Sequence, residues 1–326
     1  MGLLALDFMV RALLAGALTG LMAPAVGTYI VQRRLSMLGD GLGHVAIAGV
    51  GLALMTGQAP VPIAVAVCVS GAVIIELLRQ SGRASGDVGL AILFYGGLAS
   101  GVLMAGMAGR GAGTLSQYLF GSLTSVNGAD LAAVAAMAVV VLVAAIGLSP
   151  QLFAVCADED YARTQGLPTR ALNLVIVILA AITVAVSMRT VGLMLVSALM
   201  VIPVATSQNL VLGFRRGLAT SMGLGLVLAV GGVVASYYLD SASGATIVVL
   251  AILVFMLTLP VGAVLQQRRR AAQPVGADDE PIFERAEPHD AMTEDALHVA
   301  VLHGDHVDYL HDGHRHAPHG DHFDEH

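Results

Sequence analysis

Long apolar runs separated by short polar segments dominate the first 270 residues of the chain. Nine of these runs are each about 20 residues long, the length at which an α-helix crosses a bilayer. They cover residues 8–31, 37–57, 60–79, 86–108, 129–147, 171–188, 191–212, 217–239 and 245–266. The boundary at SMRTVG (187–192) is the least distinct, because two runs meet there with almost no loop. Two short helices and one broken helix fit it equally well, so eight to ten spans fit the pattern. The pattern predicts an all-α polytopic membrane protein with about nine transmembrane helices.

The arginines between these runs favour one orientation. If the N-terminus lies outside, the inner loops receive Arg33, Arg34, Arg79, Arg83, Arg163, Arg170, Arg215, Arg216 and Arg268 to Arg270. The outer side then receives only Arg11, Arg110 and Arg189. The positive-inside rule therefore predicts an N-terminus outside a plasma or inner cell membrane, and an odd span count leaves the C-terminus in the cytoplasm. An eight-span model would place arginine clusters on both sides, so nine spans are preferred.

Charge composition divides the chain into two regions. Residues 1–270 contain 14 arginines and 9 acidic residues, whereas residues 271–326 contain 2 arginines, 14 acidic residues and ten of the eleven histidines. We therefore expect a transmembrane domain at 1–270 and an acidic, histidine-rich tail at 271–326. A tail of this composition cannot bury a core, which predicts disorder.

Histidine-rich tracts bind metal ions, and imidazole suits zinc better than manganese. The candidate ligands in the tail are His303, His306, His311, His314, His316, His319, His322 and His326. The alternative is a solvated tail without a role in metal binding.

Two absences limit the chemistry of the chain. There is no lysine in the sequence, and a P-loop requires a lysine on the β- and γ-phosphates. If ATP drives transport here, another polypeptide must hydrolyse it. No HExxH or GxSxG motif occurs either, so we expect neither an enzyme nor a resident cofactor, and nothing indicates a nucleic-acid partner.

Asp40 and His44 are unusual because they lie inside an apolar run, MLGDGLGHVAIAGVGLAL. Four residues apart, they share one face of a helix. An ionised aspartate at mid-bilayer costs about 2.5–3.5 kcal/mol on insertion scales, and such groups usually face a bundle interior or an aqueous path. His44 lies about 12 Å along the span, too deep to be purely interfacial. A carboxylate with an imidazole suits Zn²⁺ and Mn²⁺, so the pair is a candidate transient metal contact. The alternative is a structural pair near Arg33 at the cytoplasmic end.

The longest polar stretch inside the apolar region is PQLFAVCADEDYARTQGLPTRALN, residues 150–173. It lies on the cytoplasmic side in the orientation above. Asp158, Glu159 and Asp160 would begin a short helix that ends near Gly166, with acidic groups at its positive end. An ordinary loop and a docking element for a cytoplasmic partner fit this stretch equally well.

Five segments together resemble the permease subunits of zinc, manganese and iron ABC importers, the ABC-3 permeases. They are MLGDGLGHVAIAGVGLA, SGDVGLAILFYGGLASGVL, QYLFGSLTSVNGADL, DEDYARTQGLPTRALN and VGLMLVSALMVIPVATSQNL, in the family's order across about residues 8–267. The sequence departs from the family patterns at Gly43, Ala48, Glu159 and Val204, where serine, proline, proline and alanine are usual. Asp40 and His44 are retained.

The resemblance implies a vitamin-B12-importer-like helical bundle that works as a homodimer. It also implies two cytoplasmic ATPase subunits and an extracytoplasmic metal-binding protein as partners. The family's intramembrane metal contact corresponds to Asp40 and His44, and its ATPase-coupling segment corresponds to Asp158, Asp160, Ala162 and Gly166. We expect Zn²⁺ as the transported substrate, with Mn²⁺ and Fe²⁺ as alternatives. The histidine-rich tail lies outside the resemblance.

A secondary zinc transporter is the nearest rival class, because such proteins also carry histidine-rich segments. They would be expected to place several histidine and aspartate ligands on different spans. This sequence has a single intramembrane histidine, which favours the importer permease. A sensor that uses the tail to report cytoplasmic zinc is a weaker alternative.

Overall fold

The computed structural model describes residues 7–82, 86–109, 115, 118–119, 121, 128–272, 299–303, 306–311, 314–319 and 322–325. The chain separates into two compact units, Met1–Leu265 and Gln266–His326, and each is considered by itself below.

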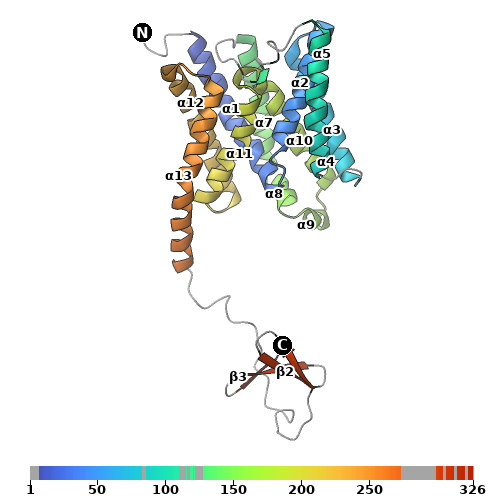
Figure 1. The fold of residues 1–326 in the computed structure, drawn as a ribbon, viewed down its shortest axis with the longest axis vertical. Helices are drawn as coiled ribbons and strands as arrows, with labels where there is room; N and C mark the ends of the chain where they lie inside the picture. Colours follow the sequence, from blue (N-terminus) through green and yellow to red (C-terminus); the bar gives the residue numbers. More distant parts are fainter. Residues whose placement is uncertain are drawn as a thin grey trace. The chain divides into compact units, whose positions relative to one another are not determined.

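Within the described ranges of the first unit, nine helical segments are long and apolar enough to cross a bilayer. Their bounds are α1 (Asp7–Gln32), α2 (Leu38–Thr56), α3 (Pro60–Gln80), the continuous α4 (Gly86–Ala91), η2 (Ile92–Gly96) and α5 (Gly97–Met107), α7 (Gly128–Gly147), α10 (Thr169–Val191), α11 (Leu193–Leu210), α12 (Phe214–Leu239) and α13 (Ser243–Ala272). Two short helices, α8 (Ser149–Ala157) and α9 (Glu159–Thr164), lie at one end of the bundle (Figure 1). The predicted all-helical architecture with about nine spans is confirmed.

The indistinct boundary at 187–192 is a sharp break between two helices. Only Gly192 separates α10 from α11, and its φ of 89° lies in the region that favours glycine. A Cβ atom on Gly121 would lie 2.5 Å from the Gly192 nitrogen, so another segment packs directly onto the break. The two runs are therefore separate spans joined by a single residue.

Four helices form the interior of the bundle. Apart from Leu152 of α8, the largest fully buried side chains come from α1, α2, α10 and α11. By contrast, α3, α7, α12 and α13 expose many large apolar side chains, as expected of helices that face lipid. This arrangement encloses α2, the helix that carries Asp40 and His44.

Small residues bring the inner and outer helices close together. A Cβ atom on Gly20 of α1 would lie 2.5 Å from the Gly225 oxygen of α12 and 2.8 Å from the Ala229 Cβ atom. Backbone approach of this kind replaces hydrophobic driving force in helix association within membranes. The abundance of glycine in the spans therefore has a packing function at this crossing.

The second unit contains four short strands among the residues that the structure describes. Its strands β1 (Val299–His303), β2 (His306–His311), β3 (His314–His319) and β4 (His322–Glu325) form an antiparallel sheet in the order β1-β2-β3-β4. The dipeptides between successive strands in the sequence are Gly-Asp, Asp-Gly and Gly-Asp, which favour two-residue hairpins. The disorder of residues 271–326 stays a prediction, and residues 273–298, 304–305, 312–313, 320–321 and 326 lie outside the described residues.

Candidate functional site

Asp40 and His44 lie near the beginning of α2, on the face that an i,i+4 spacing shares. Asp40 is half-buried in the first turn of the helix, where an acidic side chain also benefits from the positive end of the helix dipole. No side chain caps this helix end. The helix terminus thus favours the negative charge of Asp40.

The His44 side chain is enclosed by the neighbouring span. It is 8% exposed, and its ring lies 4.1 Å from the ring of Phe94, centroid to centroid, at an interplanar angle of 69°. Its Nδ1 atom is buried and has no hydrogen-bond partner. Since most buried polar atoms are satisfied, an imidazole nitrogen without a partner is a free ligand position.

Phe94 belongs to a π-helix, η2, so the segment that packs against the His44 ring is itself π-helical. π-Helical turns inside α-helices are rare and often occur at functional sites. Immediately after η2, Gly97 packs so closely that a Cβ atom there would lie 2.6 Å from the carbonyl carbon of His44. Sequence reasoning missed Phe94 and Gly97; the Gly-Gly pair at 96–97 was the one signal that could have indicated them.

A third helix, α11, approaches the same turn of α2. A Cβ atom on Gly39 would lie 3.3 Å from the Met200 sulfur and 3.8 Å from the Ser197 hydroxyl oxygen. The Ser197 Oγ atom is also buried without a hydrogen-bond partner. Two unsatisfied buried polar atoms, on His44 and Ser197, therefore occur along this part of α2 and its neighbour.

Among the side chains that the structure describes, no group of three or more His, Cys, Asp or Glu residues could hold a metal ion. Asp40 and His44, the α2 pair, are two potential ligands, fewer than the four of a structural zinc site. Two ligands suit an ion that must bind and leave rather than one that stays.

The predicted coupling segment folds into the short helix α9. Asp158 is its N-cap residue and accepts a hydrogen bond from the Tyr161 backbone nitrogen at 2.8 Å. Ala162 is fully buried, and the Leu167 nitrogen donates to its carbonyl oxygen at 3.1 Å. Gly166 ends the turn with a φ of 79°, in the left-handed region. Asp160 is exposed, and Arg163 lies 3.5 Å from its carboxylate.

A buried arginine connects α9 to the loop before α2. The Arg33 side chain is 7% exposed and lies 3.7 Å from the carboxylate of Glu159. Burial lowers the pKa of Arg33, and nearby Arg79 lowers it further. Arg79 in turn makes two hydrogen bonds to Glu76, at 2.7 and 2.9 Å, and the Glu76 side chain is 2% exposed. Glu76 is therefore part of an enclosed charge cluster, which its place near a loop in the sequence did not indicate.

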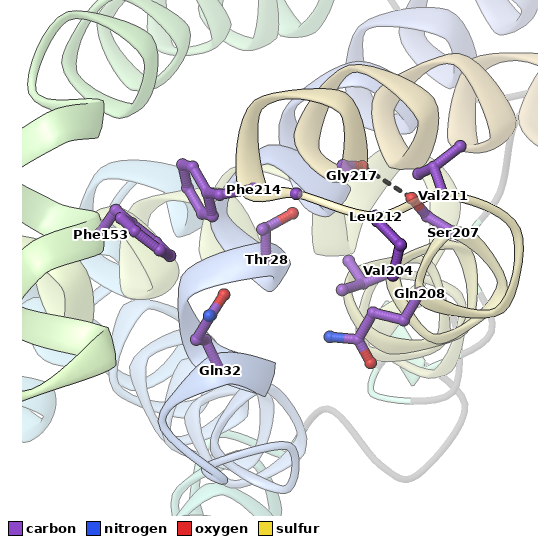
Figure 2. Close-up of a pocket in the computed structure, with 11 residues that line it drawn as sticks. Thr28, Gln32, Phe153, Val204, Ser207, Gln208, Val211, Leu212, Phe214 and Gly217 are labelled. Carbon is purple, nitrogen blue, oxygen red and sulfur yellow. Dashed lines mark hydrogen bonds between the residues drawn. The ribbon is translucent and has the colours of Figure 1, made fainter. Parts of the chain in front are cut away.

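A cavity of about 380 Å³ opens near α8, and its lining does not include the α2 pair. Figure 2 shows that its lining comes from the end of α1, from Phe153 of α8 and from the junction of α11 and α12, where Ser207 donates a 2.8 Å hydrogen bond to the Gly217 carbonyl. Neither Asp40 nor His44 lines it. This cavity therefore belongs to the α8 end of the bundle and is distinct from the α2 pair.

The nine membrane-length helices among the described residues define a multi-pass α-helical membrane protein. The chain belongs to the ABC 3 transport family, whose model matches residues 5–262. The resemblance read from the five sequence segments is thereby confirmed.

Curated relatives cover most of the same residues. The "High-affinity zinc uptake system membrane protein ZnuB" of Haemophilus influenzae is 27% identical over 257 residues, which is 78% of this chain and 97% of that protein. The "Manganese transport system membrane protein MntC" of Halalkalibacterium halodurans is 30% identical, over 78% of this chain and 87% of that protein.

A solved structure shows the same fold. "PsaBC from Streptococcus pneumoniae in complex with Fab" has a TM-score of 0.71 and 26% identity, over 82% of this chain and 97% of the matched chain. The expected vitamin-B12-importer-like bundle is confirmed by this likeness.

Proposed function

We propose that the chain is the membrane permease subunit of an ABC importer that carries zinc into the cytoplasm. Asp40 and His44 contact the ion transiently as it passes. The observation that carries this proposal is the unsatisfied Nδ1 atom of His44, buried in the most enclosed part of the bundle four residues after a carboxylate.

Zinc is favoured because imidazole is a better ligand for zinc than for manganese, and the tail adds ten histidines to the one in the bundle. Manganese is the second candidate, since the similar MntC protein is named for manganese transport; iron is a third within the same family. A secondary transporter has less support, because the described spans hold no cluster of three or more potential ligands.

The partners follow from the class. The absence of lysine excludes a P-loop in this chain, so a separate ATPase subunit hydrolyses ATP. Helix α9, with Asp158, Asp160, Ala162 and Gly166, would contact that subunit, and Arg33 would join it to the loop before α2. An extracytoplasmic protein would deliver the ion, and a second copy of the permease would complete a homodimer.

Contacts at one end of the bundle support the proposed orientation. The arginine-bearing ends of α1, α3 and α10 meet at α9: Arg33 pairs with Glu159, and Gln80 donates to the Arg170 carbonyl at 3.3 Å. By the positive-inside rule this end is cytoplasmic, which leaves the N-terminus outside.

The test uses the assembled transporter in proteoliposomes with its ATPase and binding protein. We expect His44→Gln and Asp40→Asn each to reduce zinc uptake at least tenfold while membrane insertion and basal ATP hydrolysis persist. Tyr95→Phe is the matched control, because Tyr95 is next to Phe94 but its side chain is 70% exposed. Normal uptake of both zinc and manganese by the two variants would refute the assigned contact. Uptake that continues with an inactive ATPase would instead favour the secondary transporter.

A further inference from the structure

Two neighbouring hollows at the α8 end of the bundle belong to one groove. The cavity of about 380 Å³ described above and a second hollow of about 600 Å³ share four lining residues, which are Phe153, Leu212, Gly213 and Phe214. The second hollow continues along the start of α8 and reaches Arg215 and Arg216 in the first turn of α12. We call the two hollows together the α8–α12 groove.

The α8–α12 groove presents apolar side chains that the described part of the chain does not cover. Phe153 and Phe214 lie together on one side of the first cavity (Figure 2), with ring centroids 4.4 Å apart at an interplanar angle of 33°. Both remain partly exposed, and Leu212 between α11 and α12 is 65% exposed. A contiguous apolar surface in a concave site is typical of a place that binds an apolar ligand or meets a membrane.

The α8–α12 groove lies at the level where two spans end. Only residues 211–213 separate α11 from α12, so Leu212 stands between two membrane-length helices. Arginine side chains at the ends of spans extend to the level of the lipid headgroups. In the proposed orientation this end is cytoplasmic, and the cytoplasmic leaflet contains anionic lipids. The groove is therefore placed to meet both headgroups and acyl chains.

The charge at the α8–α12 groove is positive and has no counter-charge in the described part of the chain. Arg215 and Arg216 are exposed, and neither forms an ion pair with a side chain that the structure describes. None of the residues that line the two hollows is acidic. By contrast, Arg33 and Arg163 lie 3.7 and 3.6 Å from the Glu159 carboxylate. The groove is thus complementary to an anion rather than to a neutral or cationic group.

We propose that the α8–α12 groove binds one anionic phospholipid. Its phosphate contacts Arg215 and Arg216, and part of an acyl chain lies against Phe153, Leu212 and Phe214. Basic pockets between membrane helices bind anionic headgroups in this way, and the forked donors of a guanidinium match a phosphate. A zwitterionic lipid has the same phosphate, but its ammonium group cancels the charge. Since each arginine near an anionic surface strengthens binding roughly fivefold, we expect a preference of about tenfold or more for the anionic lipid.

Tryptophan fluorescence tests this site without measuring transport, because the chain contains no tryptophan. Leu212→Trp places a single reporter in the groove at an exposed position, where the change should not disturb folding. The full-length variant is reconstituted in phosphatidylcholine liposomes with lipids that are brominated on the acyl chain. Brominated phosphatidylglycerol should quench this reporter at an about tenfold lower mole fraction than brominated phosphatidylcholine. Leu257→Trp, 70% exposed on α13 and outside the groove lining, should show no preference.

Two double variants on the Leu212→Trp background separate the groove from the general charge of the protein. R215Q/R216Q should abolish the preference for brominated phosphatidylglycerol. The matched control R34Q/R170Q removes the same charge from exposed arginines that line neither hollow, and it should keep the preference. Equal preferences in the two double variants would overturn the proposal, as would a Leu212→Trp reporter that both lipids quench alike.

A last measurement distinguishes a lipid from the ATPase subunit as the occupant of the α8–α12 groove. Native mass spectrometry of the transporter assembled with its ATPase should show phosphatidylglycerol still bound to the permease, and R215Q/R216Q should lose it. Release of the lipid on assembly would assign the arginines to the ATPase contact and refute the lipid site. The lipid site does not depend on which ion is transported, so it and the proposed function can fail separately.

Discussion

Replacing Gly97 by alanine is expected to displace the candidate metal contact, whereas replacing its neighbour Gly96 is not. A Cβ atom on Gly97 would lie 2.6 Å from the His44 carbonyl carbon and 2.6 Å from the Val45 nitrogen, about 0.8 Å closer than the 3.4 Å at which ordinary contact begins. Around Gly96 no atom lies within 4 Å of the added carbon. Both residues are helical, with φ of −62° and −66°, so backbone strain does not distinguish them.

The expected magnitude follows from this overlap. Overpacking a well-packed interior costs about 1–3 kcal/mol, while alanine gains up to about 1 kcal/mol over glycine in helix propensity at both positions. The propensity gain cancels between the two variants, so Gly97→Ala should be destabilised by about 1–3 kcal/mol relative to Gly96→Ala. A shift near 1 Å in a positioned group costs enzymes up to about a hundredfold, so we expect zinc uptake to fall about tenfold or more.

The assay compares the two alanine variants in the same proteoliposomes at matched protein levels. Zinc uptake and thermal stability in detergent are measured in parallel, because a variant that only unfolds would lose both in proportion. We expect Gly97→Ala to lose uptake even at temperatures where it remains folded. The reasoning would be refuted if both variants took up zinc at the wild-type rate.

Three further outcomes are expected. Gly225→Ala should destabilise the protein in detergent by about 1–3 kcal/mol, because its Cβ atom would overlap the backbone of α1. Gly223→Ala meets no atom within 4 Å and should leave the stability unchanged. Equal melting temperatures for the two variants would contradict this. Asp158→Ala should remove the N-cap hydrogen bond of α9, weaken that helix by about 1 kcal/mol and reduce the ATP hydrolysis that is coupled to transport. Asp158→Asn can still accept the hydrogen bond and should keep most of the coupled hydrolysis. Full coupling in the alanine variant would argue against a coupling role for α9. Burial raises the pKa of the Cys156 thiol to about 12, so less of it is thiolate at any given pH. Because maleimide reacts with the thiolate, labelling at pH 8 should be about a thousandfold slower than for a free thiol. The labelling rate should increase as the pH is raised.

The membrane-spanning helices could be predicted from the sequence because one quantity, the length of an apolar run, decides whether a segment can cross a bilayer. A bilayer requires about 20 consecutive apolar residues, so the nine runs and nine membrane-length helices agree. The charge of the tail predicts disorder, which stays a prediction. An averaged charge carries no information on the Gly-Asp and Asp-Gly dipeptides in the tail, which favour two-residue hairpins. Turn chemistry acts through particular residues and disappears in a composition.

Some residues of the candidate site could be identified from the sequence, and others could be identified only from the packing. Asp40 and His44 could be found because a charge inside an apolar run is expensive and therefore conspicuous. Phe94 and Gly97 are ordinary residues of a span, and their importance arises only from the π-helix that turns Phe94 onto His44 and from the backbone that Gly97 approaches. Arg33 shows a third case: its sequence position predicts a solvated loop charge, yet packing by α3 and α9 buries it beside Glu159. Removing an arginine from water costs several kcal/mol unless partners compensate, and the Glu159 carboxylate, 3.7 Å away, supplies part of that compensation. The pair joins α9 to the loop before α2. Glu159 belongs to the segment DEDYARTQGLPTRALN, but Arg33 belongs to none of the five segments that carry the family resemblance, so the sequence motifs alone could not indicate this contact.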